Sequence, residues 1–334
     1  MLAKKLELYM AKPGDLTIKE YQPVQEIGDN EVKLEVIYGG ICGSDLSVYK
    51  GKLPYAQFPC RPGHEILGTV IAAGKNAPYK VGTKVASFPN TYCGECEFCR
   101  QGKTNICKNK KSFGVTINGL FAQEIVIDAE FVVPVPAGLP DERAVLAEPF
   151  AVIVHALKKV SVSPGMSAAV VGCGTEGSLA AALLLHRGAD LTVMDVNPVK
   201  MQIAQSLGKN VKTLHPNDVK DEMFDVVVEA AGTKASVEQA FQLVKPGGTM
   251  IGVGITSENI SYPAIRITRS EITIHGSIIY VKKDFEDAFA LLSKPDFKVD
   301  PVISKIVPLA AYHQAFSDAL SGNFVKVVLD FKQT

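Results

Sequence analysis

The run Ala168-Ala-Val-Val-Gly172-Cys-Gly174-Thr-Glu-Gly177 gives the strongest indication of how this chain folds. Its four leading apolar residues, 168–171, predict a strand buried on both faces, as the strands of parallel sheets are. The apolar segment 178–185 predicts a buried helix directly after it. A Gly-x-Gly-x-x-Gly turn in this context is typical of dinucleotide binding, because the helix start offers free N–H groups to a pyrophosphate.

Each residue of this turn has a predicted role. Gly172 allows the tight turn, Gly174 lets the backbone approach the pyrophosphate, and Gly177 lets the helix pack close to the strand. Thr175 and Glu176 lie between these glycines and are expected to line the same cofactor site. A glycine-rich turn without a ligand is the simpler alternative, which the flanking strand and helix disfavour.

Asp195 ends the next predicted strand, 191–195. Its carboxylate can accept hydrogen bonds from both hydroxyls of an adenosine ribose, and it would repel a 2′-phosphate. No arginine follows Asp195 immediately. The sequence therefore predicts NAD rather than NADP as the cofactor.

Strand and helix patterns alternate on both sides of this turn. A helix is predicted over 150–160 with Pro149 at its start, and Asn197 and Pro198 predict the cap and first residue of another helix. Another predicted helix, 237–244, is ended by the run 245–248, Lys-Pro-Gly-Gly. Further strands are predicted over 224–229 and 249–253. This alternation indicates a doubly wound parallel sheet, with residues 151–285 as the NAD-binding domain.

The first half of the chain has a different character. Short β-like runs broken by Gly and Pro predict a barrel-like β domain over residues 1–150. The predicted strands are 31–37, 68–72, 84–87 and 123–127. Residues 286–334 are expected to return to this first domain through a last strand over 324–331. The predicted fold class is therefore a two-domain α/β protein.

The composition of the chain excludes some classes of binding partner. Thirty-five basic residues balance thirty-five acidic ones among 334 residues, which removes the electrostatic case for a nucleic-acid partner. No apolar run has the length of a membrane span, so no membrane partner is expected. The first fifteen residues do not resemble a secretory signal, and seven cysteines then favour metal binding in the reducing cytoplasm over disulfides.

Four cysteines lie close together between residues 93 and 107. Cys93, Cys96, Cys99 and Cys107 suit one tetrahedral Zn²⁺ with every position filled by protein, which predicts a structural zinc. An iron–sulfur cluster is the alternative, but the ferredoxin pattern has its last cysteine closer and a proline after it.

Scattered residues could supply a second metal site, although their spacing alone does not unite them. A catalytic zinc needs about three protein ligands and one open position, and Cys42, His64 and Glu148 or Glu65 can supply a thiolate, an imidazole and a carboxylate. Taken singly, each has an ordinary structural explanation. The remaining histidines, His155 among them, are expected to be structural.

These motifs together resemble the zinc-containing medium-chain dehydrogenase family, in its sorbitol/polyol and threonine dehydrogenase branches. The resemblance covers essentially the whole chain and includes the runs 42–45 (Cys-Gly-Ser-Asp) and 63–68 (Gly-His-Glu-Ile-Leu-Gly). It also includes the four-cysteine segment, Glu148-Pro149 and the glycine turn with Asp195. The resemblance implies a GroES-like catalytic domain, a Rossmann cofactor domain and a homodimer or homotetramer.

The resemblance also implies roles for the scattered residues. Cys42, His64 and Glu148 would bind or line the catalytic zinc, with Glu65 as the carboxylate that binds metal or water depending on state. Ser44 would pass on the substrate proton. The expected reaction transfers a hydride between NAD and a small polyol or secondary alcohol, with two zinc ions per chain.

Departures from the family pattern leave the substrate open. Ser47 stands where many relatives carry a histidine, and residues 119–122 read Gly-Leu-Phe-Ala rather than Gly-Gly-Phe-Ala. Ser270, with Arg269 before it, replaces the arginine of the sorbitol branch. A threonine-type hydroxy amino acid dehydrogenase and a non-catalytic NAD-binding protein are therefore kept as alternatives. A zinc-free reductase would not need the metal-binding residues, and a zinc-ribbon nucleic-acid binder does not suit the neutral charge.

Overall fold

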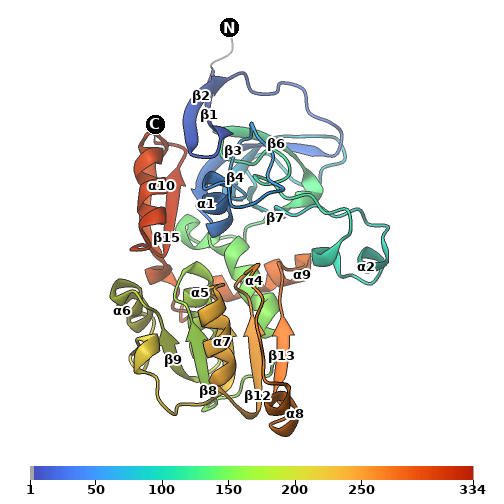
Figure 1. Ribbon diagram of the computed structural model, residues 1–334. Helices are drawn as coiled ribbons and strands as arrows, with labels where there is room; N and C mark the ends of the chain where they lie inside the picture. Colours follow the sequence, from blue (N-terminus) through green and yellow to red (C-terminus); the bar gives the residue numbers. More distant parts are fainter. Residues whose placement is uncertain (1–3, 334) are drawn as a thin grey trace.

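A computed structural model describes residues 4–333 of the chain. Figure 1 shows a β-rich region built by the N-terminal part and an α/β region built by the later part, with the C-terminal segment returning to the first. Within residues 4–333, no helix is both long and apolar enough to cross a membrane.

A seven-stranded sheet organises the β-rich region, in the order β14-β15-β3-β4-β5-β7 with β6 paired to β3. Its strands are β3 (Glu31–Gly40), β4 (Glu65–Ala73), β5 (Lys84–Ser87), β6 (Glu124–Asp128), β7 (Val132–Pro134), β14 (Ile303–Pro308) and β15 (Lys326–Asp330). A separate hairpin, β1 (Lys5–Lys12) and β2 (Asp15–Tyr21), pairs antiparallel beside it. The short helices here are α1 (Gly43–Tyr49), α2 (Glu97–Arg100) and α3 (Asp141–Ala144), with 3₁₀ turns at Thr104–Ile106 and Ala129–Phe131.

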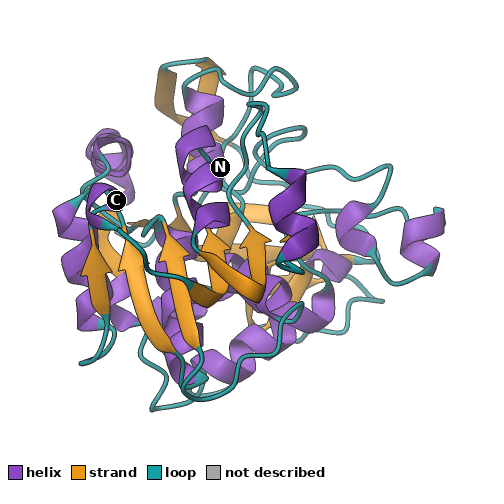
Figure 2. Ribbon diagram, turned by 60° about the horizontal axis from the view of Figure 1, so that its bottom comes forward, coloured by secondary structure: helices purple, strands orange, loops and turns teal. Residues whose placement is uncertain are grey.

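A six-stranded parallel sheet organises the second region, in the order β10-β9-β8-β11-β12-β13. The strands are β8 (Ser167–Val171), β9 (Asp190–Met194), β10 (Lys212–Leu214), β11 (Phe224–Glu229), β12 (Val244–Gly252) and β13 (Thr273–Gly276). Helices lie on both faces of this sheet, as Figure 2 shows. They are α4 (Ala147–Leu157), α5 (Thr175–His186), α6 (Pro198–Ser206), α7 (Lys234–Gln242), α8 (Ala264–Arg269) and α9 (Lys282–Leu292), with 3₁₀ turns at Pro216–Asp218 and Asp300–Val302.

The side chains of β8 alternate between two apolar cores, which explains why helices cover both faces of this sheet. Ala168 and Val170 belong to the core that holds α4, α5 and α9. Ala169 and Val171 belong to the core on the other side, with Phe241 of α7. Successive side chains of a strand point to opposite faces, so a continuous apolar run needs two apolar layers. The predicted α/β fold with a doubly wound parallel sheet is confirmed.

Some predicted boundaries were wrong. The helix predicted over 150–160 begins at Ala147, so Pro149 occupies its third position, which the first turn tolerates. The helix predicted over 237–244 ends at Gln242, and Val244 already pairs with Phe224 of β11. The register of this pairing then shifts before Thr249, and Gly247 adopts a φ of 75° within the shifted segment. The turn residues therefore form an irregularity inside β12 rather than the end of a helix.

The C-terminal segment joins the first sheet. A 3₁₀ turn at Leu309–Ala311 leads into α10 (Tyr312–Ser321), after which β15 pairs antiparallel with β3, with Val328 opposite Gly40. This pairing carries the residues at the start of β15 to the end of β3. The functional residues described next gather at that end.

Candidate active site

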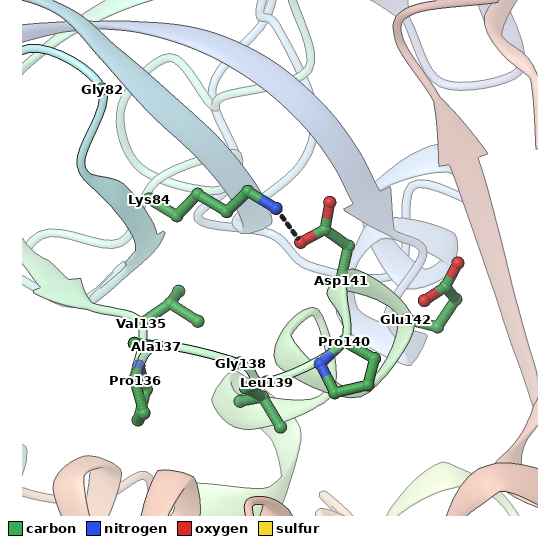
Figure 3. A pocket seen from close by; sticks show the side chains of 10 residues that line it. All are labelled: Gly82, Lys84, Val135, Pro136, Ala137, Gly138, Leu139, Pro140, Asp141 and Glu142. Carbon is green, nitrogen blue, oxygen red and sulfur yellow. Dashed lines mark hydrogen bonds and ion pairs between the residues drawn. The ribbon is translucent and has the colours of Figure 1, made fainter.

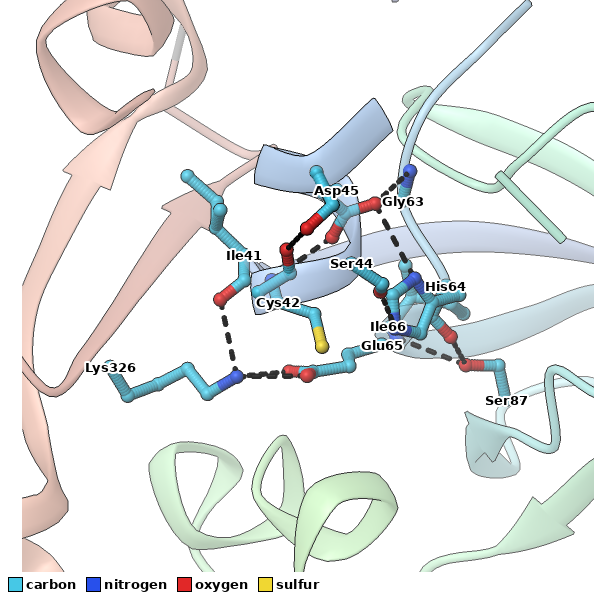
Figure 4. A network of polar contacts seen from close by, with 12 residues as sticks. Ile41, Cys42, Ser44, Asp45, Gly63, His64, Glu65, Ile66, Ser87 and Lys326 are labelled. Carbon is cyan, nitrogen blue, oxygen red and sulfur yellow. Dashed lines mark hydrogen bonds and ion pairs between the residues drawn. The ribbon is translucent and has the colours of Figure 1, made fainter. Parts of the chain in front are cut away.

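Cys42, His64 and Glu65 converge at the end of β3. One ligand atom from each of these residues lies within 4.8 Å of the others. The register of the sheet explains this, because Gly40 near the end of β3 pairs with Glu65 at the start of β4. Gly40 also leaves necessary space, since a Cβ there would stand 2.2 Å from Glu65 Oε2. Figure 4 shows the three residues close together, with the Glu65 carboxylate directed toward the Lys326 ammonium.

Asp45 organises the loop around this cluster. Its fully buried carboxylate accepts hydrogen bonds from the backbone N–H groups of Cys42 and Gly63, each at 3.0 Å. His64 Nδ1 lies 3.4 Å from Asp45 Oδ1, a distance of ionic contact rather than of a good hydrogen bond. Burial alone would raise the pKa of Asp45, but the His64 charge and these hydrogen bonds lower it. Asp45 therefore ties together the two loops that supply Cys42 and His64.

Lys326 belongs to this cluster as well, although its sequence pattern did not predict it. Its ammonium lies 2.8 and 2.6 Å from the two oxygens of Glu65 and 3.3 Å from the carbonyl oxygen of Ile41 (Figure 4). The side chains of Lys326 and Glu65 are 1% and 0% exposed. Burial opposes the charge of Lys326, but Glu65 and Cys42 raise its pKa. A single lysine inside the apolar run 324–331 was the available sequence indication.

Glu148 lies in the first turn of α4, outside the group formed by the three convergent residues. The Tyr280 hydroxyl donates a hydrogen bond to its Oε1 at 2.6 Å. Burial and the neighbouring charge of Glu65 raise the pKa of Glu148 to about 7. Tyr280 is also a residue that the sequence analysis missed, since a tyrosine after a strand carries no distinctive pattern.

The two serines of the α1 region differ in what they contact. Ser44 Oγ lies 3.4 Å from His64 Nε2, beside the cluster. Ser47 Oγ donates to the carbonyl oxygen of Gly43 at 2.9 Å, within its own helix. Only Ser44 therefore faces the candidate metal ligands.

The glycine turn before α5 has the geometry that its residues predict. Gly172 adopts a φ of 94°, in the left-handed region that favours glycine. A Cβ on Gly177 would stand 1.8 Å from the carbonyl oxygen of Gly172, whereas a Cβ on Gly174 would meet nothing within 4 Å. Gly177 is thus required for packing, and Gly174 faces open space that a ligand could enter.

Three polar side chains surround this turn. Asp195 Oδ2 accepts from the backbone N–H of Cys173 at 2.7 Å, and Asp195 Oδ1 accepts from that of Asn197 at 2.8 Å. The Thr175 hydroxyl donates to the carbonyl oxygen of Val325 at 2.8 Å, which fastens α5 to the start of β15. Glu176 Oε2 is buried without a partner, and burial and the charge of Glu148 raise the pKa of Glu176.

The four predicted zinc-binding cysteines also converge. One Sγ from each of Cys93, Cys96, Cys99 and Cys107 lies within 4.8 Å of the others. The Sγ atoms of Cys93 and Cys107 are 3.6 Å apart, and all four thiols are free rather than joined in disulfides. This group lies in the segment that carries α2, which projects from the β-rich region in Figure 1.

A surface hollow of about 590 Å³ lies elsewhere, over the loop between β7 and α3. It is lined by Gly82, Lys84 and residues 135–142, and Lys84 is paired with Asp141 at 2.6 Å inside it (Figure 3). It shares no residue with either cysteine site or with the glycine turn. We therefore do not include it in the candidate active site.

Comparison with known proteins identifies the family. Residues 28–137 match the family described as "Alcohol dehydrogenase GroES-like domain", and residues 177–294 match "Zinc-binding dehydrogenase". D-arabinitol dehydrogenase 1 of Uromyces fabae is 31% identical over 98% of this chain and 97% of that protein. The chain belongs to the zinc-containing medium-chain dehydrogenase family. The resemblance inferred from the sequence motifs is thereby confirmed.

Further proteins are similar along most of the chain. Sorbitol dehydrogenase of Bacillus subtilis is 33% identical over 78% of each chain. A protein of Escherichia coli CFT073 described as a short chain alcohol dehydrogenase, crystallised with NADH, superposes with a TM-score of 0.91 at 25% identity, covering 98% of this chain and 99% of that one. A zinc-binding dehydrogenase of Sinorhizobium meliloti 1021 bound to NADP shares the fold, with a TM-score of 0.91 at 24% identity and coverage of 98% and 100%.

Proposed function

We propose that this chain is a zinc-dependent, NAD-linked dehydrogenase that oxidises a hydroxyl of a small polyol or secondary alcohol to a ketone. The convergence of Cys42, His64 and Glu65 is the observation that supports this most strongly. Their surroundings extend to the cofactor turn, because the Thr175 hydroxyl of α5 donates to the carbonyl oxygen of Val325, the residue before the Lys326 that pairs with Glu65. The arabinitol and sorbitol dehydrogenases named above support a polyol as the substrate class.

The donor set fits a catalytic zinc ion. Thiolate, imidazole and carboxylate ligands bind Zn²⁺ at about 2.0–2.3 Å, so the ligand atoms of a tetrahedral site lie about 3.5 Å apart. The observed limit of 4.8 Å between the ligand atoms needs only small side-chain movements to meet this. Cys42, His64 and Glu65 would hold the ion, with Glu148 as the alternative carboxylate. A fourth position would stay open for substrate.

Residues of the chain hold the zinc ligands in place and transfer the proton of the substrate hydroxyl. When bound, zinc supplies a Lewis acid that lowers the pKa of the substrate hydroxyl, and NAD supplies the hydride acceptor. Asp45 holds His64 and the Cys42 loop in place through its contacts with both. We assign to Ser44 the role of relaying the hydroxyl proton, because its hydroxyl lies beside His64 at 3.4 Å: its oxygen would accept that proton while its own hydrogen passes to solvent.

Asp195 supports NAD as the cofactor. Each of its carboxylate oxygens accepts one backbone hydrogen bond and keeps a lone pair for a ribose hydroxyl. The residues that we propose to bind NAD are Gly172, Gly174, Thr175, Glu176, Gly177 and Asp195.

The four-cysteine group supports a second, structural zinc. All four ligands come from protein, so this site would have no open position for substrate. We propose two zinc ions per chain.

We assign residues 1–150 to the catalytic domain, residues 151–285 to the cofactor domain, and residues 286–334 to the return segment. The pairing of β15 with β3 supports this division. A homodimer or homotetramer is supported by β13, an edge strand of the parallel sheet whose Ile274 is 37% exposed. Seven free cysteines support a reducing, cytoplasmic location.

An activity screen tests this function. Purified, zinc-loaded protein is assayed with D-arabinitol, sorbitol, 2,3-butanediol and L-threonine, each with NAD or NADP, by the absorbance of the reduced cofactor. We expect reduction of NAD with at least one polyol or diol, loss of turnover after chelation and recovery with Zn²⁺. Turnover of L-threonine alone would replace the substrate class with a hydroxy amino acid. No turnover with any of these substrates would contradict the proposed function.

A further inference from the structure

The backbone before Tyr280 adopts a rare conformation. Ile279 has a φ of 54°, in the left-handed region that β-branched residues seldom occupy. This bend lies between β13 and α9 and turns Tyr280 inward, where the side chain is 1% exposed. The Tyr280 hydroxyl then reaches Glu148 Oε1 at 2.6 Å. The position of this hydroxyl therefore depends on how the bend at Ile279 is held.

Asn105, two residues before Cys107, contacts this bend. Its side chain is largely buried, and Nδ2 donates to the carbonyl oxygen of Ile278 at 3.0 Å. The same nitrogen lies 3.4 Å from His155 Nε2. His155 Nδ1 is 2.7 Å from Asp284 Oδ2, so Nδ1 carries the hydrogen and Nε2 can accept from Asn105. The Asn105 amide thus contacts both the bend, at Ile278, and helix α4, at His155.

Aromatic packing makes a second connection to the same tyrosine. The Phe88 ring meets Tyr280 edge-on, with centroids 5.4 Å apart and planes at 81°. Tyr92 meets Phe88 edge-on in turn, with centroids 6.3 Å apart, and Tyr92 directly precedes Cys93. Tyr92, beside Cys93, therefore connects to Tyr280 through ring contacts, and Asn105, near Cys107, connects by a hydrogen bond to the bend that precedes Tyr280.

We propose that the four-cysteine lobe, residues 93–107, positions the Glu148 carboxylate of the active site through Asn105 and Tyr280. This inference rests on the proposed function, in which Glu148 is the alternative carboxylate ligand of the zinc ion and lines its site. Asn105 and Tyr280 are positioning residues, because neither is placed among the metal ligands and each acts through its neighbour. A reacting group that moves by a fraction of an ångström loses rate although the fold survives. The lobe would then be part of the active-site support as well as a stable unit of the fold.

A double-mutant cycle distinguishes this role from a purely structural one. The variants are Asn105→Ala, Tyr280→Phe and the two together, with Lys103→Ala as the matched lobe control, since Lys103 is exposed and bonds only within the lobe. We expect Asn105→Ala and Tyr280→Phe each to lower kcat roughly tenfold, with KM for NAD changed less than about twofold. If Asn105 acts through Tyr280, the double variant is no slower than Tyr280→Phe alone.

Two outcomes of the cycle would overturn the proposal. Independent effects would multiply to roughly a hundredfold loss in the double variant, and an unconnected Asn105 would leave kcat of Asn105→Ala at the wild-type value. Asn105→Asp provides a second arm if the alanine variant does not fold. It keeps the side-chain volume but cannot donate to Ile278, and the same loss of kcat is expected.

Hydrogen exchange tests the connection without any turnover. The Ser277 N–H donates to the carbonyl oxygen of Gly252 at 2.9 Å, and the Val281 N–H donates to Asp284 Oδ2 at 3.0 Å. We expect Asn105→Ala to raise exchange at these two amides severalfold and Lys103→Ala to leave it unchanged. Unchanged exchange in Asn105→Ala would overturn the inference. If the wild-type protein oxidises no alcohol, the proposed function falls, and exchange still decides whether the lobe holds the bend.

Discussion

The ammonium of Lys326 lies 2.6 Å from Glu65 Oε2, although the two residues are 261 positions apart in the chain. Both side chains are buried, and the pair connects the C-terminal strand β15 to the start of β4. Removal of one partner from a buried ion pair destabilises the fold strongly, because the other charge stays buried without compensation. The Lys326–Glu65 ion pair therefore connects strand β15 to Glu65, a candidate metal ligand.

In the metal-free protein, Lys326→Met should strongly destabilise the fold, because it leaves Glu65 as a buried carboxylate without its partner. We expect a loss of about 3–5 kcal/mol in the free energy of unfolding, measured by urea denaturation. The control is Lys75→Met, which removes an exposed pair with Asp29 whose side chains are 72% and 58% exposed. That variant should lose less than about 0.5 kcal/mol. Equal effects of the two substitutions would contradict the role assigned to the buried pair.

Cys42→Ser should abolish alcohol oxidation while NAD still binds, because Cys42 belongs to the candidate catalytic zinc site and the glycine turn is untouched. Metal analysis should find zinc reduced from about two ions per chain to about one. Cys96→Ser is the matched variant, and it should remove the other ion and lower thermal stability. The assignment fails if Cys42→Ser keeps both ions and full turnover.

Gly174→Ala and Gly177→Ala should impair different properties of the protein: the first NAD binding, the second thermal stability. A Cβ at Gly177 would stand 1.8 Å from a backbone oxygen, so this variant should unfold at a clearly lower temperature. A Cβ at Gly174 meets nothing, so that variant should keep the wild-type melting temperature and bind NAD at least about tenfold more weakly. Differential scanning calorimetry and NAD titration measure the two effects. Normal NAD affinity in Gly174→Ala would argue against a cofactor at this turn.

Asp195→Ala should weaken NAD binding and relax the preference for NAD over NADP. The carboxylate is expected to accept hydrogen bonds from the ribose and to repel a 2′-phosphate, and the substitution removes both effects. Dissociation constants for the two cofactors, measured by fluorescence titration, give the ratio directly. Thermal unfolding serves as the control, because Asp195 also accepts from the Cys173 N–H. An unchanged ratio would exclude this role for Asp195.

Asp284 should contribute stability that depends on pH. Burial would raise its pKa, but hydrogen bonds from His155 and Lys158 lower the pKa from 3.8 to about 2. A carboxyl group with a lowered pKa stabilises the fold above its unfolded pKa, and this contribution disappears as pH falls through the folded value. Asp284→Asn should therefore cost roughly 2 kcal/mol at pH 6, and the difference from wild type should shrink toward pH 3. Urea unfolding at several pH values measures it, and a difference independent of pH would refute the electrostatic origin.

The sequence alone was sufficient to predict features whose residues lie close together in the chain. The glycine turn joins a strand and a helix that are adjacent in the chain, so the roles of Gly172 and Gly177 follow from the backbone geometry of a few residues. The four cysteines lie within fifteen residues, and a chain segment that short can enclose one ion. The alternating apolar runs likewise indicated the parallel sheet, because strands buried on both faces have a recognisable composition.

Only the tertiary structure decided how the distant residues meet. Cys42 and Glu65 lie together because the register of β3 and β4 places Gly40 opposite Glu65, and strand register is a property of the whole sheet. Lys326 reaches Glu65 through the pairing of β15 with β3, and Tyr280 reaches Glu148 through a left-handed residue at 279. No local spacing encodes these contacts, since each depends on the packing of segments that are distant in the chain.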